Sequence, residues 1–278
     1  MNLPKIPLAG WIEWMEAWLE AHLDPFFQLI RTVVGETVNG LDTALNWFPP
    51  LVLIVIFTLI AWYIGKWKMA LFTLIGLLII ENLGLWSQTM QTLALVLTAA
   101  FISVLIGVPA GILCARNSSI QKIVTPVLDF MQTMPAFVYL LPAVTFFSLG
   151  VVPGVISSII FAIPPTIRLT NLGIRQVSPE LVEAADAFGS TPAQKLFKLQ
   201  LPLAMPTIMA GVNQTIMLSL SMVVIASMIG AQGVGASVYR AVTQGNTGVG
   251  FEAGLAIVIL AIVLDRLTQQ VIRKSKTS

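Results

Sequence analysis

The sequence predicts an all-α protein, a polytopic membrane helical bundle that crosses the bilayer about seven times. Two observations lead to this fold class. Of the 278 residues, 56% are hydrophobic and only 10% are charged, whereas about 25% of residues are charged in soluble domains. The apolar residues also gather in long runs, many of them near the ~20 residues that a helix needs to cross the hydrocarbon core. We therefore expect a multi-pass protein of the cell membrane, with lipid around it and no nucleic-acid partner.

Residues 1–48 are predicted to form an amphipathic segment outside the cytoplasm. Within it, residues 11–27 place apolar side chains on one stripe of a helix and glutamates on the rest. Tryptophans on such a stripe are typical of the membrane interface. Residues 26–48 are too polar to span, so we expect the segment to lie on the membrane or pack against the bundle, with peptide binding as an alternative. The stripe consists of Trp11, Ile12, Met15, Trp18, Leu19 and Phe26.

Seven apolar segments follow as candidate spans. Two short ones within residues 49–88 are interpreted as accessory helices, joined by a tight turn at Gly65-Lys66-Trp67-Lys68. The other five lie within residues 89–272, and prolines in the fourth and fifth spans predict kinks whose freed carbonyls need neighbouring helices. The predicted spans are 49–65, 68–86, 90–115, 127–150, 152–170, 203–230 and 252–272. The glycine-rich break at 231–251 is interpreted as an outer loop, or alternatively as a loop that re-enters the pore.

The basic residues predict the orientation, because cytoplasmic loops carry an excess of lysine and arginine. If residues 171–202 are cytoplasmic, twelve of the fifteen basic residues lie inside and most acidic residues lie outside. The N-terminus is then outside and the C-terminus inside. The inner set is Lys66, Lys68, Arg116, Lys122, Arg168, Arg175, Lys195, Lys198, Arg266, Arg273, Lys274 and Lys276, and the outer set is Lys5, Arg31 and Arg240.

A charged amphipathic segment from 178 to 202 predicts two short helices joined at a glycine. Ser178 can cap the first helix, and Pro179 suits its first position. Gly189 supplies a helix stop. A second helix is predicted to begin at Pro192, after Ser190 or Thr191, and to end at Pro202. The apolar face of the first helix consists of Leu181, Ala184, Ala185 and Phe188.

The same segment contains a spaced motif: Glu183-Ala184-Ala185, three residues, Gly189, nine residues, then Leu199-Gln200-Leu201-Pro202. It resembles the EAA signature of ATP-binding-cassette (ABC) importer permeases, EAA-x3-G-x9-I-x-L-P, and departs from it only in Leu199. The resemblance implies that residues 171–202 form a cytoplasmic coupling loop that docks into a groove on a separate ATPase; a solvated helical hairpin is the alternative. The implied coupling residues are Glu183, Ala184, Ala185, Phe188, Gly189, Leu201 and Pro202.

Longer segments narrow the resemblance. Thr125–Pro142, Gly150–Arg168 and Asn213–Ala226 look like the glycine betaine/proline betaine (quaternary amine) permeases, within the binding-protein-dependent transport system inner-membrane component family. This resemblance implies a type I ABC importer fold for residues 89–272 and uptake of quaternary-amine osmoprotectants by alternating access. It also implies partners: two copies of an ABC ATPase, an extracytoplasmic substrate-binding protein and a second permease chain in a homodimer.

The sequence offers no catalytic or metal site of its own. It has no G-x-x-x-x-G-K-[ST] phosphate cradle, so ATP and Mg are expected on the partner ATPase and this chain is not an enzyme. The one cysteine, Cys114, and the one histidine, His22, make a cysteine- or histidine-based site improbable, and we expect no metal to bind.

Polar side chains inside predicted spans are informative, because each costs free energy unless it is partnered. Asn213 and Ser221 are eight residues apart and share a helix face near Met217. The sequence fits two roles for Asn213 and Ser221 equally well: they line a polar pathway, or they form hydrogen bonds between helices. An aromatic such as Tyr139 can attract a quaternary ammonium in transit, or simply pack. The candidate pathway residues are Gln132, Tyr139, Asn213, Met217 and Ser221.

Two aspartates have simpler interpretations. Asp129 follows Thr125 and Pro126, which predict a helix start, so its carboxylate is expected in a stabilised first turn, with proton or cation binding as the alternative. Asp265 is expected to pair locally with Arg266.

Three rival functions remain: an ABC permease for another solute such as an amino acid or sulfonate, an ion-coupled secondary transporter, which requires unpaired acids in mid-span, and a membrane scaffold.

Overall fold

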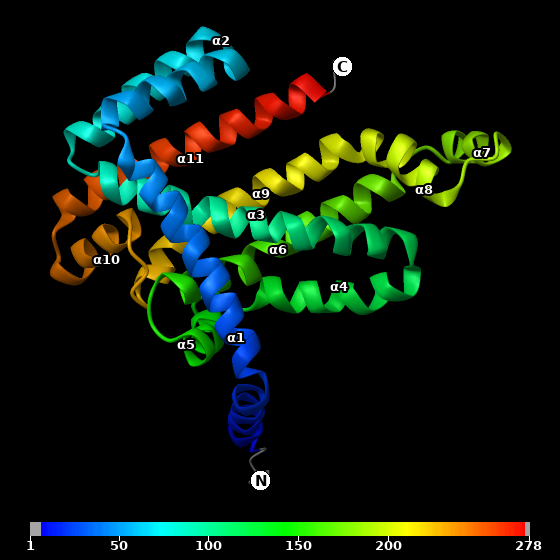
Figure 1. Ribbon diagram of the computed structural model, residues 1–278, viewed down its shortest axis with the longest axis horizontal. Coiled ribbons are helices and arrows are strands. Elements are labelled where there is room, and N and C mark those ends of the chain that lie inside the picture. The colour runs from blue at the N-terminus through cyan, green and yellow to red at the C-terminus, as the bar shows by residue number, and fades with distance from the viewer. Residues whose placement is uncertain (1–6, 276–278) are drawn as a thin grey trace, which may run out of the picture.

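The computed structural model describes residues 7–275, with side chains up to residue 270, and this part of the chain is helical without a strand. The predicted all-α class is confirmed. Figure 1 shows a bundle from which the N-terminal part of α1 and the α7–α8 end project in different directions. The elements are α1 (Leu8–Trp47), α2 (Pro50–Asn82), α3 (Trp86–Arg116), α4 (Ser118–Thr133), η1 (Ala136–Tyr139), α5 (Leu140–Phe147), α6 (Val151–Arg175), α7 (Pro179–Ala187), α8 (Pro192–Gln194), η2 (Lys195–Gln200), α9 (Leu201–Ser227), α10 (Val234–Gln244) and α11 (Thr247–Ser275).

The centre of the bundle is the packing of α3, α6 and α9, which lie side by side (Figure 1). Small residues let these helices approach closely, as is common in membrane bundles. A Cβ built on Gly111 of α3 would lie only 2.5 Å from the Thr170 Cβ and 2.7 Å from the Ile167 carbonyl oxygen of α6. Between α6 and α9, the Thr166 and Thr215 hydroxyls lie 2.7 Å apart in a fully buried position.

Residues 8–47 form one continuous helix, α1, so the predicted helix at 11–27 is too short. Arg31 and Glu36 do not break the helix, because they lie on its exposed side while Val34 and Val38 are buried in the main core. Phe27 stacks on Phe146 of α5, with ring centroids 4.4 Å apart. The C-terminal half of α1 therefore packs against the bundle, whereas the N-terminal half projects next to α5 (Figure 1).

The number of membrane-crossing helices is lower than predicted. By length and hydropathy, five helices of the described part qualify, or six if one bent pair is counted as a span. The predicted spans 49–65 and 68–86 both belong to α2, which is broken by non-helical angles at Lys66 (φ 66°, ψ −176°) within the predicted turn. Each half of α2 is ~24 Å long, which is shorter than the ~30 Å hydrocarbon core.

The predicted fourth span is the bent pair. α4 and the η1–α5 segment meet at an angle of 108°. The bend follows from Pro135, because the residue before a proline avoids the helical region, and Met134 is extended (ψ 137°). α4 begins earlier than predicted, at Ser118, where the Asn117 side chain accepts hydrogen bonds from the Ser119 and Ile120 amides. The predicted helix start at Thr125–Pro126 is therefore wrong, and Asp129 lies near the end of α4 instead of in a first turn.

The break at 231–251 is not simply a loop, because it contains the helix α10. Gly233 (φ 118°) precedes this helix and Gly245 (φ 67°) ends it, in backbone conformations that favour glycine. The Val234 amide donates to the Thr92 hydroxyl of α3 over 2.9 Å, and both residues are buried. α10 thus packs against the bundle, which sequence polarity alone did not reveal.

The contact at Gly111 gives a direct test of the close packing between α3 and α6. We expect Gly111→Ala to lower the free energy of unfolding by roughly 1–3 kcal/mol, because the new methyl group meets a backbone carbonyl that cannot move freely. Gly254→Ala in α11 is the matched control, since nothing lies within 4 Å of its built Cβ, and alanine favours a helix over glycine by about 1 kcal/mol. Thermal unfolding in detergent, followed by tryptophan fluorescence, measures both; equal melting temperatures would contradict this account.

Candidate coupling hairpin and transport pathway

The first half of the hairpin is α7, which begins with Pro179 directly after Ser178, as predicted. Ser178 stands at the N-cap position, but its hydroxyl accepts no hydrogen bond from the backbone amides of the helix. Instead it donates to the Glu180 carboxylate. This hydrogen bond is the main reason why the pKa of Glu180 lies below its ordinary value. Glu183 and Ala184 are exposed on α7, and Ala185 is half-buried.

Gly189 ends α7 in the left-handed conformation, with φ +74°. The amides after the helix turn back onto it: Gly189 donates to the Asp186 carbonyl (2.9 Å) and Ser190 to the Ala185 carbonyl (3.0 Å). This pair of bonds is a Schellman motif, in which the left-handed position strongly favours glycine. The predicted helix stop is confirmed at the level of its backbone hydrogen bonds.

The second half of the hairpin begins with a capping box. The Thr191 hydroxyl accepts from the Gln194 amide, and the Gln194 side chain accepts from the Thr191 amide. Lys195 then reaches back across the glycine to the Asp186 carboxylate, with Nζ–O distances of 2.6 and 2.7 Å. An exposed ion pair of this kind contributes about 0–1 kcal/mol, but it fixes how the two halves of the hairpin lie against each other.

Pro202 does not end the second helix, contrary to prediction. The chain is helical without interruption from Pro192 to Ser227, through η2 and into the candidate span α9. η2 is a π-helix, in which the Leu201 amide donates to the Leu196 carbonyl five residues back. A proline lacks the amide hydrogen and clashes with the carbonyl four residues before it. A π-turn directly before the proline accommodates both effects, so the helix continues.

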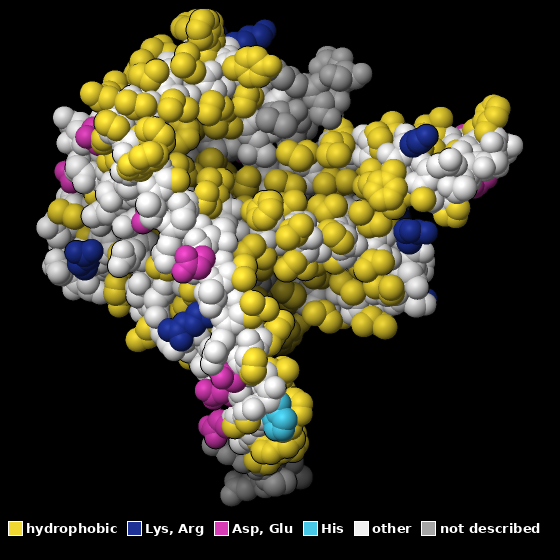
Figure 2. Space-filling model, in the orientation of Figure 1, with side chains coloured by type: hydrophobic (Ala, Val, Ile, Leu, Met, Phe, Trp, Pro, Cys, Tyr) yellow, Lys and Arg dark blue, Asp and Glu magenta, His cyan; other side chains and the backbone are white. Residues whose placement is uncertain are grey.

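The tip of the hairpin presents unpartnered apolar side chains. Phe188 is 90% exposed, and Phe197 and Leu181 are exposed as well. Figure 2 shows hydrophobic and charged side chains mixed on this projecting end. Of the remaining predicted coupling residues, Pro202 is exposed, while Leu201 packs against a small core that joins α9 to α3 and α6. Five of the seven predicted residues thus lie on the hairpin, and the last two lie on the helix that connects it to the bundle.

The five candidate pathway residues are not brought together. Tyr139 is buried, its hydroxyl donates to the Met131 carbonyl, and its ring lies against Phe161. Asn213 of α9 donates to the Asp265 carboxylate of α11 over 2.9 Å. This contact supports the alternative of hydrogen bonding between helices for Asn213.

The other three candidates lie apart as well. Met217 packs against the main core, and Ser221 is exposed with its hydroxyl bonded to the Met217 carbonyl of the same helix. Gln132 is exposed on α4, a different helix from the α9 that carries these two. A shared pathway of all five residues therefore stays a prediction that this arrangement does not favour.

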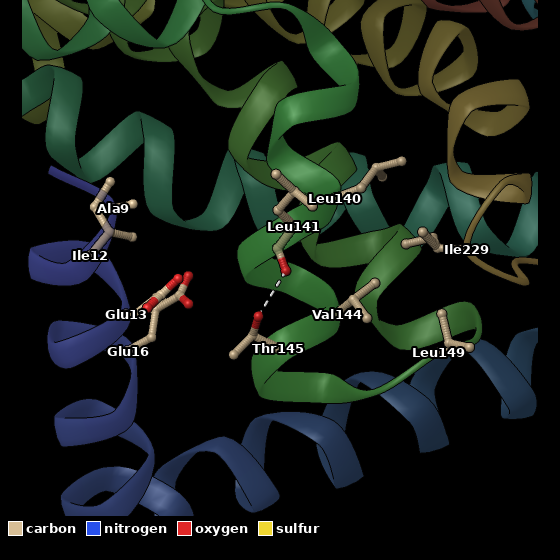
Figure 3. Close-up of a pocket in the computed structure, with 10 residues that line it drawn as sticks. All are labelled: Ala9, Ile12, Glu13, Glu16, Leu140, Leu141, Val144, Thr145, Leu149 and Ile229. Atoms are coloured by element: carbon tan, nitrogen blue, oxygen red, sulfur yellow. Dashed lines mark hydrogen bonds between the residues drawn. The ribbon is translucent and has the colours of Figure 1, made fainter. Parts of the chain in front are cut away.

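A groove of ≈ 590 Å³ lies elsewhere, between the N-terminal half of α1 and α5. Figure 3 shows the Glu13 and Glu16 carboxylates of α1 pointing into the space between the two helices, opposite an apolar wall. None of the candidate pathway residues lines it. Its lining consists of Ala9, Ile12, Glu13, Glu16, Leu140, Leu141, Val144, Thr145, Leu149 and Ile229.

Sequence reasoning assigned the wrong partner to Asp265 and no partner to Asp129. Asp265 accepts from Asn213 and Gln269, and the expected pair with Arg266 is not among the ion pairs of the described residues. Asp129 pairs with Arg168 of α6, with 2.6 Å between Oδ1 and Nη2. These partners are 39 and 52 residues away along the chain, so no local pattern could have indicated them.

Comparison with known families agrees with the geometry. The model of the family described as binding-protein-dependent transport system inner membrane component matches residues 107–277, which include the hairpin. The chain belongs to this family. It is therefore a membrane component of a transport system that works with an ATPase and a substrate-binding protein. The predicted class of binding-protein-dependent permease is confirmed, and the secondary-transporter and scaffold alternatives are excluded. The docking of residues 171–202 on an ATPase stays a prediction.

Curated relatives in this permease family are similar over nearly the whole chain. The glycine betaine transport system permease protein OpuAB of Bacillus subtilis is 57% identical over 99% of this chain and 98% of its own length. The glycine betaine/carnitine permease GbuB of Listeria monocytogenes is 54% identical over 99% of both chains. The glycine betaine/proline betaine permease ProW of Escherichia coli is 53% identical over 98% of this chain and 77% of its own length.

A solved structure supports the fold. An inward-facing crystal form of the MetNI methionine ABC transporter matches with a TM-score of 0.64 at 22% identity, over 69% of this chain and 95% of that chain. The predicted type I ABC importer fold is confirmed by this likeness, which says nothing about the solute.

The Asn213–Asp265 contact gives a test of what Asn213 does. We expect Asn213→Ala to lower the free energy of unfolding by about 1 kcal/mol, because Asp265 loses a donor from the neighbouring helix. Ser221→Ala is the matched control on α9, since its hydroxyl bonds only within its own helix, and it should leave the melting temperature unchanged. Thermal unfolding in detergent compares the two; an unchanged melting temperature for Asn213→Ala would show that the interhelical bond contributes nothing.

Proposed function

We propose that this chain is the permease subunit of an ABC importer that takes up glycine betaine or a related quaternary-amine osmoprotectant. The observation that carries this proposal is identity of 53–57% to three glycine betaine permeases over 98–99% of the chain. The aligned regions cover 98–99% of this chain and so include nearly all of its helical part.

The proposed topology places the N-terminus outside the cell and the hairpin and C-terminus inside. The distribution of basic residues supports it. Lys5 and Lys276 in that count lie outside the described residues, as do the side chains of Arg273 and Lys274. On the inner side, the exposed Phe188 would fill an apolar groove on an ABC ATPase that binds ATP and Mg. Two ATPase copies, a permease homodimer and an extracytoplasmic binding protein complete the proposed complex.

The proposed mechanism is alternating access driven through the hairpin. Closure of the ATPase dimer on ATP would move α7 by its exposed apolar tip. The Asp186–Lys195 pair and the Schellman motif hold α7 to the second half of the hairpin. Because that half continues as one helix to Ser227, its motion is passed into the bundle instead of being absorbed in a loop.

The proposed function is tested by reconstituting the chain with its ATPase and binding protein in proteoliposomes. We expect ATP-dependent uptake of labelled glycine betaine, with no stimulation of uptake by an imposed proton or sodium gradient. Labelled amino acids and sulfonates are the rival solutes. Uptake of one of these in preference to glycine betaine would assign the chain to the alternative, an ABC permease for another small solute.

Gly189 gives a test of the coupling role. We expect Gly189→Asp to leave membrane insertion intact and to reduce uptake per ATP hydrolysed at least ~10-fold, because it places a charge beside the apolar tip. Gly189→Asn keeps a residue that tolerates the left-handed conformation without the charge, so its effect should be smaller. Gly40→Asp on the exposed side of α1 controls for an added charge. Normal coupling in the Gly189→Asp complex would count against docking of this hairpin.

A further inference from the structure

One charged pair joins two helices of the bundle that belong to candidate spans. Asp129 of α4 and Arg168 of α6 form an ion pair of 2.6 Å, yet their side chains are 59% and 38% exposed. α6 is a candidate span, and α4 belongs to the bent pair that forms another. Charged side chains in such segments are costly against lipid, so they face a bundle interior or a water-filled space. The face of α4 and α6 that carries this pair therefore does not face hydrocarbon.

The pair is not what holds α4 against α6. Leu128 of α4 is buried together with Ile163 and Ile167 of α6 and Cys114 of α3, next to the charged pair. This apolar contact accounts for the packing of the two helices. An exposed ion pair beside it adds about 0–1 kcal/mol, so stability alone does not explain why these two helices carry the pair.

The pair also leaves hydrogen-bonding capacity unused. Arg168 contacts Asp129 through one nitrogen, Nη2, and its buried Nε has no partner. A guanidinium prefers to bind a carboxylate with two parallel bonds. Gln132, one helical turn beyond Asp129, is exposed on the same side of α4. The site thus offers a guanidinium held to Asp129 by a single bond, a carboxylate with one oxygen outside that bond, and the exposed amide of Gln132.

We propose that Asp129 and Arg168 form a binding site for a zwitterionic solute in the transport pathway, an inference that rests on the proposed function. The guanidinium of Arg168 would exchange its single bond to Asp129 for the solute carboxylate, and Asp129 would face the quaternary ammonium. A quaternary nitrogen has no hydrogen to donate, so an opposite charge must recognise it. The two residues neutralise each other when the site is empty, which avoids an uncompensated charge before loading and after release.

The first experiment measures uptake by the complete complex in proteoliposomes. We expect Asp129→Asn and Arg168→Gln each to reduce glycine betaine uptake roughly tenfold or more, the loss expected from one charge-assisted hydrogen bond. The reversed pair, D129R with R168D, restores an ion pair between α4 and α6 but misplaces both charges for the solute. It should therefore keep a melting temperature close to that of the wild type without recovering uptake. Recovery of both would show a structural latch and overturn the proposal.

A second experiment detects the solute at the site. Cys114 is first replaced by Ala, so that Gln132→Cys introduces the single cysteine of the chain. This substitution leaves the charges of Asp129 and Arg168 in place. A small water-soluble thiol reagent then labels the new cysteine. We expect glycine betaine to slow this labelling. Choline and 3,3-dimethylbutanoate, which each carry only one of its two charges, should slow it much less. The protection by glycine betaine should disappear when R168Q is added. Asp186→Cys on the hairpin is the reactivity control, which should label without protection. No labelling of Gln132→Cys, or labelling that glycine betaine does not slow, overturns the proposal.

These outcomes separate this inference from the proposed function. A wild-type complex that does not take up glycine betaine contradicts the proposed function. If the wild-type complex takes up glycine betaine and the D129N and R168Q complexes take it up at the same rate, only the proposed binding site is contradicted.

Discussion

The structure depends on one uninterrupted helix that runs from the hairpin into the centre of the bundle. Two prolines, Pro202 and Pro206, lie in this helix, and either could have ended it. The π-turn of η2 absorbs the first by shifting the hydrogen bond of Leu201 to Leu196. Leu196 is itself buried, in a cluster with Ile174 of α6 and partly buried residues of α3. The base of the hairpin is thus fixed to three helices at once.

This constraint explains why the hairpin is built stiffly. Its turn is a Schellman motif, its second half begins with a capping box, and an ion pair crosses between its halves. Each contact is weak alone, since caps contribute about 1 kcal/mol and exposed ion pairs less. Together they remove the freedom that a loop of the same length would have. A partner that moves Phe188 therefore moves α9, and α9 cannot move without α6, because Gly211 lies against the backbone of α6 at Pro165.

The polar groups of the bundle fall into two kinds. The Thr166–Thr215 contact and the Asn213–Asp265 contact lie between helices that pack closely, and they satisfy groups that hydrocarbon would leave unpaired. The Asp129–Arg168 pair is different, because both side chains remain open on one side. Polar groups of the first kind orient the helices, whereas the second kind implies water or a solute next to it.

The sequence predicted the hairpin well because its signals are local. A cap, a glycine and two prolines act on backbone groups within four residues, and the structure places Pro179, Gly189 and Pro192 as expected. The bend at Pro135 was predictable for the same reason.

The errors involve partners far along the chain. Pro202 was expected to stop a helix that tertiary packing of Leu196 and Leu201 keeps intact. The helix α10 is stabilised by Thr92, 142 residues earlier. The partner of Asp129 is set by how α4 lies on α6, which follows from the packing of Leu128 and not from any spacing in the sequence. Local propensity predicts such elements poorly because burial overrides it.

The exposed face of α4 bears on the number of permease chains. Next to Asp129, the helix exposes Val127 and Phe130, with 53% and 63% of each side chain accessible. Lipid would suit these two apolar residues but not the carboxylate between them, and water would suit only the carboxylate. A second protein surface meets both demands, because it can cover the apolar side chains while leaving a polar space at Asp129. The second permease chain of the proposed complex is one protein surface that would meet both demands.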